Sequence, residues 1–413
     1  MSLAAIRAWW ESRTGWEKTA LVVWSAILLV VCVRVYGWPE AKTVYPIYSA
    51  SGYFWWTGTA LYAPDRPGWA QGGYRYSPTF AILCVPFALF PDNVGGVVWR
   101  LLCTAGLLGS LTWLAHSLST KLWSRDHFAL LLLFCVPLSL QSVNNGQANI
   151  VVIAALLAAV AAAKEQRWNL VAALIALAFV CKIYPLALGL LLMLLYPRQL
   201  SWRIPLSVAA SLLLPFLLQN PAYAADQYRK WFTVLYYDDR STIDLDQAYR
   251  DLWLLIRLYA LPISRQVYVL AQLLAGAGIA VVCWHRRRTG WPEKQLLIST
   301  LALAVTWMLL LGPTTESCSF ILLAPSLSWS MVEAMRSDVA KWRQALLWVS
   351  VTFFGAAVML ADFKWIVNVH AVGVHSWASL FYFVYLLTQP PNKSSEISGA
   401  RFVELAGASY LKK

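Results

Sequence analysis

A run of amides with one glycine, Asn-Asn-Gly-Gln-Ala-Asn at residues 144–149, separates two long apolar stretches and has no charge nearby. Amide side chains do not titrate, so they are poor acids and bases, but they both donate and accept hydrogen bonds. They therefore suit neutral, hydroxyl-rich ligands such as sugars. The alternative is a helix–helix turn in which asparagine and glycine fill the turn positions. We expect Asn145, Gln147 and Asn149 to hold sugar hydroxyls or to fix the loops around them.

A lysine stands at a break between two apolar runs, in Cys-Lys-Ile-Tyr-Pro at residues 181–185. Pro185 interrupts the helical pattern, which leaves Lys182 and Tyr184 beside the break. A lysine at the end of a span can extend its ammonium to the membrane interface. The other interpretation is that this cation binds an anion such as a lipid-linked phosphate.

Two tyrosines flank an arginine in Tyr-Arg-Tyr-Ser-Pro at residues 74–78. The rings of Tyr74 and Tyr76 can stack on the C–H faces of a sugar, and Arg75 offers a bidentate fork for phosphate. The alternative is an aromatic anchor at the membrane interface, with proline in the first turn of a helix.

One carboxylate, Glu316, is the only acid in the polar stretch at residues 312–317, between two apolar runs. An isolated carboxylate at a membrane boundary is often functional, although Thr315 or Ser317 here can also cap the next helix. Aspartates at residues 238–251 could bind a divalent cation, but the Asp-x-Asp-x-Asp-Gly pattern is absent. The seven cysteines show no metal-binding spacing. We therefore expect no cofactor, and a divalent metal stays open as an alternative without support from a motif.

Composition predicts an all-α polytopic membrane protein. Of the 413 residues, 59% are hydrophobic and 13% charged, against about 25% charged in soluble domains. Residues 77–91 are short and proline-containing, so we expect a re-entrant or interfacial segment there, and an interfacial helix within 48–62. The apolar runs predict about twelve transmembrane helices, at residues 19–36, 94–117, 127–143, 147–163, 168–184, 185–197, 203–219, 265–284, 295–311, 318–333, 344–361 and 371–388.

Basic residues fall in every second loop, so the net charge of +13 indicates membrane orientation rather than nucleic-acid binding. We expect a cytoplasmic N-terminus at residues 1–18, one transmembrane domain at 19–388 and a cytoplasmic tail at 389–413. The long loops at about 37–76 and 220–264 then lie outside, together with the polar turns. The predicted location is the plasma (inner) membrane of the cell, with an extracytoplasmic working face.

Three motifs in a fixed order carry a family resemblance: Tyr74 to Pro78, Gly-Gln-x-Asn ending at Asn149, and Lys182-x-Tyr184-Pro185. Their succession resembles glycosyltransferase family 87, whose members are polytopic GT-C-type enzymes. The family includes polyprenyl-phosphate-mannose-dependent mannosyltransferases. The resemblance implies transfer of a hexose, mannose above all, from a polyprenyl-phosphate carrier to a hydroxyl of a lipid or glycan. Lys182 and Arg75 would then meet the carrier phosphate.

The chain departs from the family pattern where a general base is expected. The family usually has an aspartate just after the first span, but Thr-Val-Tyr-Pro stands here at residues 43–46. The histidines expected after the Gly312 turn are replaced by Glu316 and Ser317. A glycosyl transfer needs a carboxylate near the acceptor, and the candidates are Glu40, Asp65, Asp246 and Glu316.

Two other functions stay open at this point. One is a catalytically altered relative of the fold that binds lipid or glycan, which the missing aspartate favours. The other is a secondary transporter, although no internal repeat is evident and the polar groups cluster at one face.

Overall fold

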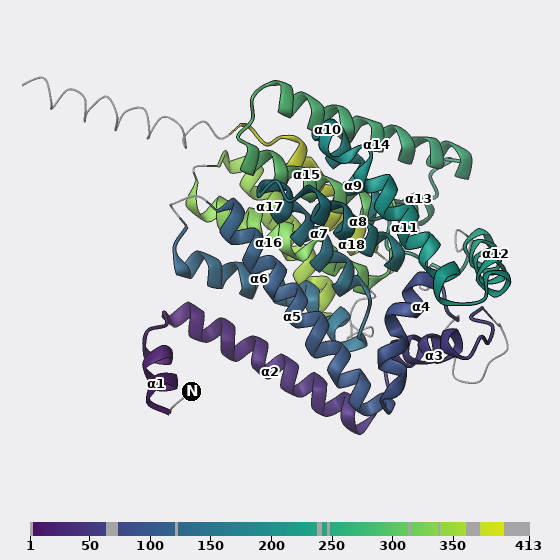
Figure 1. Ribbon diagram of the computed structural model, residues 1–413. Coiled ribbons are helices and arrows are strands. Elements are labelled where there is room, and N and C mark those ends of the chain that lie inside the picture. The colour runs from purple at the N-terminus through teal and green to yellow at the C-terminus, as the bar shows by residue number, and fades with distance from the viewer. Residues whose placement is uncertain are drawn as a thin grey trace, which may run out of the picture.

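The computed structural model describes residues 3–62, 73–119, 123–237, 242–245, 248–312, 315–337, 339–360 and 372–391. These residues form helices and connecting turns, without strands (Figure 1). The elements are α1 (Leu3–Glu11), α2 (Gly15–Gly37), α3 (Tyr45–Trp56), α4 (Pro78–Cys84), η1 (Val85–Leu89), α5 (Asp92–Leu118), α6 (Arg125–Asn145), α7 (Asn149–Lys164), α8 (Trp168–Cys181), α9 (Leu186–Leu195), α10 (Pro197–Leu200), α11 (Arg203–Leu218), α12 (Pro221–Tyr237), α13 (Leu252–Leu258), α14 (Arg265–Arg288), α15 (Glu293–Leu310), η2 (Ser317–Leu322), α16 (Ala324–Arg336), α17 (Lys341–Met359) and α18 (Val374–Leu387).

Six helical stretches within the described residues are long and apolar enough to cross a membrane, and five shorter apolar helices accompany them. The predicted class, an all-α polytopic membrane protein, is confirmed. The run predicted as one span at 318–333 differs, because it divides into the 3-10 helix η2 and the α-helix α16. Segment 77–91 forms α4 and η1, which together run from Pro78 to Leu89. That length is shorter than the ~20 residues a crossing needs.

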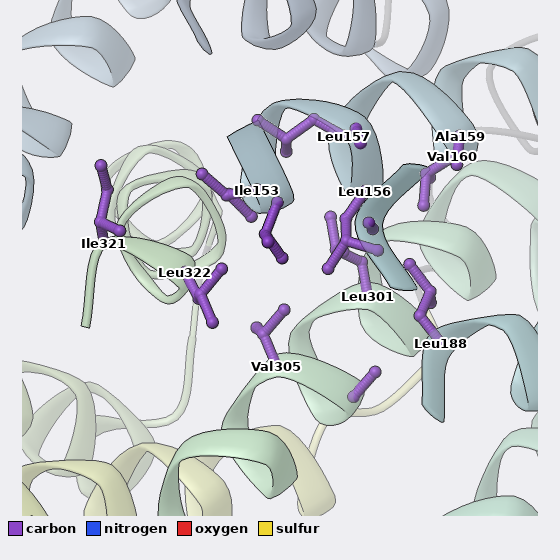
Figure 2. Close-up of a cluster of buried hydrophobic side chains, with 14 of the residues drawn as sticks. Ile153, Leu156, Leu157, Ala159, Val160, Leu188, Leu301, Val305, Ile321 and Leu322 are labelled. Atoms are coloured by element: carbon purple, nitrogen blue, oxygen red, sulfur yellow. The ribbon is translucent and has the colours of Figure 1, made fainter. Parts of the chain in front are cut away.

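The centre of the bundle is α7, which is apolar on every side and nearly fully buried. Figure 2 shows Ile153 and Leu156 of α7 facing Leu301 and Val305 of α15, with Leu322 of η2 beside them. Many of the other α7 residues are alanines, and small side chains let helix backbones approach closely in a membrane. The first residue of this rigid central helix is Asn149, so α7 fixes the position of one predicted site residue.

Helices α3, α4 and α12 lie together at one end of the bundle (Figure 1). Helix α12 holds the first long loop on both sides of residues 63–72. The Gln227 Oε1 accepts a hydrogen bond of 2.8 Å from the Leu61 N–H, and the Trp231 indole donates one of 3.1 Å to the Arg75 carbonyl. Helix α3 exposes Tyr53 and Trp56, as the predicted interfacial helix would.

The turn between α6 and α7 is closed by Gly146, which has a left-handed backbone with φ of 68°. The Gln147 N–H donates to the Ser142 carbonyl at 3.0 Å, and the Trp99 indole donates to the Gly146 carbonyl at 2.8 Å. A Cβ atom on Gly146 would lie 3.0 Å from the Arg100 Cζ. Glycine is therefore required here both by the backbone conformation and by the close approach of Arg100.

The second long loop leads into the short helix α13, which is capped by a buried aspartate. The Asp251 Oδ1 accepts from the Leu254 N–H at 3.3 Å, and its carbonyl accepts from the Ser376 hydroxyl at 2.8 Å. Burial raises the pKa of Asp251 to about 6, an effect that the Leu254 N–H and the Arg265 guanidinium only partly offset. The native state therefore holds this proton more tightly than the unfolded chain does.

We expect Asp251→Asn to raise the thermal unfolding temperature of the detergent-solubilised protein at pH 8 and to leave it unchanged at pH 4. The stability contributed by the neutral carboxyl is complete below about pH 4, the ordinary aspartate pKa. It is lost as the pH rises through about 6. Asparagine stays neutral throughout and caps a helix as well as aspartate does. The exposed Asp244 supplies the control Asp244→Asn, and an equal shift at both pH values for Asp251→Asn contradicts the prediction.

We expect Gly146→Ala to destabilise the protein by at least ~1–2 kcal/mol. The left-handed backbone is unfavourable for alanine, and the added Cβ atom would meet the Arg100 guanidinium. The measurement is the thermal unfolding temperature in detergent. Gly109→Ala on α5 is the matched control, because a Cβ there meets nothing within 4 Å. Equal unfolding temperatures for the two variants would show that the turn tolerates a side chain.

Candidate functional site

A cluster of polar side chains forms around the break between α8 and α9. Lys182 follows the last residue of α8 with an extended backbone, and its Nζ lies 5.5 Å from the centre of the Tyr184 ring. Its electrostatic neighbours also include Tyr76 and Glu316. Tyrosines are neutral near pH 7, so Glu316 is the anion of this set. Lys182 thus lies in a polar cluster at the break, and its role in binding a substrate stays a prediction.

Tyr76 connects the first long loop to the amide turn. Its hydroxyl is 2.7 Å from the Tyr48 hydroxyl, which accepts a hydrogen bond of 3.1 Å from the Ala148 N–H. Burial raises the pKa of Tyr76 to about 12, although Lys182 acts in the opposite direction. Tyr76 is therefore a neutral hydroxyl at physiological pH, able to donate to an oxygen of a ligand near Lys182.

Asn149 lies at the centre of the cluster and is fully buried. The Tyr184 hydroxyl donates to its Oδ1 at 3.5 Å, and its Nδ2 lies 4.0 Å from the Cys318 Sγ. The Cys318 thiol in turn points at the Glu316 Oε2, 3.5 Å away. These long contacts connect the turn, through Asn149 and Cys318, to the Glu316 carboxylate.

Glu316 is half-buried at the start of η2, where two loops meet. Its N–H donates to the Ser319 hydroxyl at 3.3 Å. The carbonyl of the preceding Thr315 accepts from the Arg250 N–H at 2.7 Å, so the second long loop is fixed against this turn. Of the two candidate bases within the described residues, Glu40 and Glu316, it is Glu316 that interacts electrostatically with Lys182. A carboxylate held near an ammonium by neutral donors can take a proton from a hydroxyl while the cation binds a phosphate.

The other candidate acids are placed differently. Glu40 is exposed in the turn after α2 and does not belong to the groups that face Lys182. Asp65 and Asp246 lie outside the described residues.

The remaining predicted binding residues divide between the loop and the turn. Tyr74 is buried, and its hydroxyl donates to the Ser77 carbonyl at 2.8 Å, so it holds the loop in place. Arg75 is half-buried. The Asn145 carbonyl accepts from the Val44 N–H at 3.0 Å. Gln147 is buried within the turn. The printed contacts of Tyr74 and Asn145 hold the first loop and the turn in place.

Three members of the cluster escaped the sequence analysis as site residues. Tyr48 is a single aromatic in an aromatic-rich stretch, Cys318 is one of several cysteines in apolar runs, and Arg250 is one charge in a polar loop. No local pattern distinguishes them, because segments far apart in the chain bring them together. Within the part of the chain that the structure describes, no group of three histidine, cysteine or acidic side chains is placed to hold a metal ion.

Comparison with known proteins shows to which family the chain belongs. A solved structure of ArnT from Cupriavidus metallidurans, bound to undecaprenyl phosphate, aligns with 88% of this chain and 76% of its own, at 14% identity and a TM-score of 0.42. That likeness is too distant to bear on the chemistry. No curated protein matches the sequence. The profile of glycosyltransferase family 87 matches residues 74–313, which is more than half of the chain and contains Tyr76, Asn149 and Lys182. The chain belongs to glycosyltransferase family 87.

Proposed function

We propose that this protein transfers a hexose, mannose in the first instance, from a polyprenyl-phosphate carrier to a hydroxyl of a lipid or glycan. The placement of Glu316 and Lys182 in one polar cluster carries this proposal. It supplies both a base for the acceptor and a cation for the carrier phosphate. Family membership supports the reaction type, and a membrane-embedded site supports a donor that arrives through the lipid.

Transfer requires one bond to form and one to break at the sugar anomeric carbon. The Glu316 carboxylate takes the proton of the acceptor hydroxyl, whose oxygen attacks the anomeric carbon. The bond from that carbon to the phosphate oxygen breaks, and the carrier phosphate leaves with the electron pair. Lys182 stabilises the negative charge on the departing phosphate. Attack opposite the phosphate inverts the anomeric configuration.

The neutral side chains around the pair have supporting roles. The Tyr76 hydroxyl is placed to donate to a phosphate or sugar oxygen near Lys182. The amide of Asn149 is already engaged by Tyr184 and Cys318, so we assign it to holding the site rather than to binding sugar hydroxyls.

The alternating basic loops support an extracytoplasmic site in the inner membrane. Arg7, Arg13 and Lys18 precede the first span, which favours cytoplasmic termini. The cluster then lies at the outer ends of the helices. A flipped polyprenyl-phosphate sugar and a glycan or lipid acceptor meet at that face.

We expect Glu316→Gln to lower kcat by about 10²–10⁴-fold, the usual contribution of a general base, with little change in the affinity for the donor. The measurement is transfer from a radiolabelled polyprenyl-phospho-mannose by purified protein in lipid nanodiscs. Glu40→Gln, Asp65→Asn and Asp246→Asn are assayed in parallel and should retain most of the activity. If one of these three abolishes transfer while Glu316→Gln retains it, the base is assigned to the wrong carboxylate.

We expect Lys182→Gln to raise the KM for the polyprenyl-phosphate donor by at least about tenfold, because a charge-assisted contact to phosphate is worth roughly 1.5–3 kcal/mol. Lys164→Gln is the matched control. Lys164 ends α7 and pairs with Glu293, at the end of that helix opposite to Asn149. Unchanged donor KM and unchanged kcat in Lys182→Gln together rule out the phosphate role.

A further inference from the structure

Arg100 is a fully buried arginine on α5, one of the helices long and apolar enough to cross a membrane. Its guanidinium donates to the Asn144 carbonyl at 2.8 Å, to the Thr43 hydroxyl at 2.9 Å and to the Gly96 carbonyl at 3.0 Å. A buried charge in a membrane span is costly and is kept for a reason. Its partners place it directly beneath the amide turn.

A second arginine converges on the same atom. Arg34, in the last turn of α2, donates to the Asn144 carbonyl at 2.8 Å and to the Ala41 carbonyl at 2.6 Å. Within the described residues neither guanidinium forms an ion pair with a carboxylate. Their shared acceptor is one of the last carbonyls of α6, where the helix carries its partial negative charge. Two cations therefore replace the missing hydrogen-bond donors at this helix end.

The opposite side of the turn faces the candidate site. The Ala148 N–H donates to the Tyr48 hydroxyl, and Asn149 contacts Tyr184 and Cys318. The arginines thus hold the turn at the Asn144 carbonyl, while Ala148 and Asn149 of the same turn contact the polar cluster. A displaced Asn144 carbonyl would move the start of α7, and Asn149 with it.

We infer that Arg34 and Arg100 are positioning residues for glycosyl transfer, acting as a two-arginine clamp on the Asn144 carbonyl. The inference rests on the proposed function in assigning Ala148 and Asn149 of the turn to the transfer site. Neither arginine contacts a substrate in this scheme. Their effect passes through the turn to Asn149 and the groups aligned on it.

The geometry requires arginine rather than any cation. The guanidinium of Arg100 is a planar fork that reaches three acceptors in different directions, and lysine has one nitrogen at the end of a flexible chain. Arg100→Lys therefore keeps the charge at the α6 terminus but leaves at least one of the carbonyl and hydroxyl acceptors without its donor.

Arg286 is a matched control. It is likewise buried, and it donates to the Leu386 and Leu387 carbonyls at the end of α18 at 2.7 and 3.3 Å. It also bonds Ser299 on α15. That end of α15 meets the far end of α7 through the Lys164–Glu293 ion pair, about 22 Å from Asn149 along the helix axis. Arg286→Lys makes the same chemical change to another helix terminus, away from the cluster.

The experiment compares Arg100→Lys and Arg286→Lys in nanodiscs by kinetics and by hydrogen–deuterium exchange. We expect Arg100→Lys to lower kcat at least tenfold per folded molecule while the donor KM changes less than threefold, because Lys182 is untouched. Amide exchange should accelerate at least fivefold in peptides covering residues 144–150. Arg286→Lys should keep kcat within twofold and leave exchange at 144–150 unchanged.

Other outcomes overturn the inference. An unchanged kcat in Arg100→Lys, or an equal loss of kcat in Arg286→Lys, means that the clamp is not specific to transfer. If Arg100→Lys does not fold, Thr43→Val removes the hydroxyl that accepts from Arg100 and donates to the Asn145 carbonyl, and it should lower kcat about threefold or more with faster exchange at 144–150. Wild-type kcat and exchange in Thr43→Val then overturn it. Absence of transfer by the wild-type protein refutes the proposed donor instead, and the exchange data still test whether the arginines hold the turn.

Discussion

The structure depends on how backbone carbonyls are satisfied where α6 ends inside an apolar bundle. Water is scarce there, so each carbonyl without a helical partner needs a donor from elsewhere in the protein. Arg34 and Arg100 donate hydrogen bonds to the Asn144 carbonyl. The Val44 N–H donates to the Asn145 carbonyl, and the Trp99 indole of α5 donates to the Gly146 carbonyl. The turn between α6 and α7 is therefore where α2, α5, α6 and α7 are fastened together.

The same fastening makes the polar cluster possible. Its members come from the first long loop, the α6–α7 turn, the α8–α9 break and the start of η2. These segments are far apart in the chain, so the chain itself does not keep them together. Tyr48, Asn149 and Cys318 supply the contacts between them. A rigid central helix then lets a carboxylate and an ammonium from distant parts of the chain keep a constant relation. The site is a junction of segments rather than a pocket within one of them.

The sequence predicts the helices well because an apolar run of sufficient length has few alternatives in a membrane. It predicts less where a run is apolar but irregular. The stretch 318–333 is mostly apolar, yet Pro325 stands in the first turn of a new helix and the preceding turn is a 3-10 helix. Hydropathy does not distinguish these forms, whereas proline in the first turn of a helix does.

The base is harder to predict than the helices, because proximity to Lys182 depends on tertiary packing. Glu316 and Glu40 are equally isolated acids near apolar runs, and only the packing of η2 against α6 and α7 separates them. Arg100 carries a signal that sequence reasoning overlooked. A single arginine inside a stretch assigned to a span indicates a buried partner, although the sequence does not say that the partner is a carbonyl.

The peripheral helix α2 has a consequence for biosynthesis. It enters the membrane carrying Arg34, whose acceptor at Asn144 lies 110 residues further along the chain. At ~5–20 residues per second, synthesis takes about 5–20 s to deliver that acceptor. During this interval α2 sits in lipid with its guanidinium at the end of the helix, near the interface, where long basic side chains reach water. Because Arg34 lies in the last turn of α2 rather than in its middle, the nascent chain avoids the free-energy cost of an unpaired guanidinium in the centre of the bilayer during this interval.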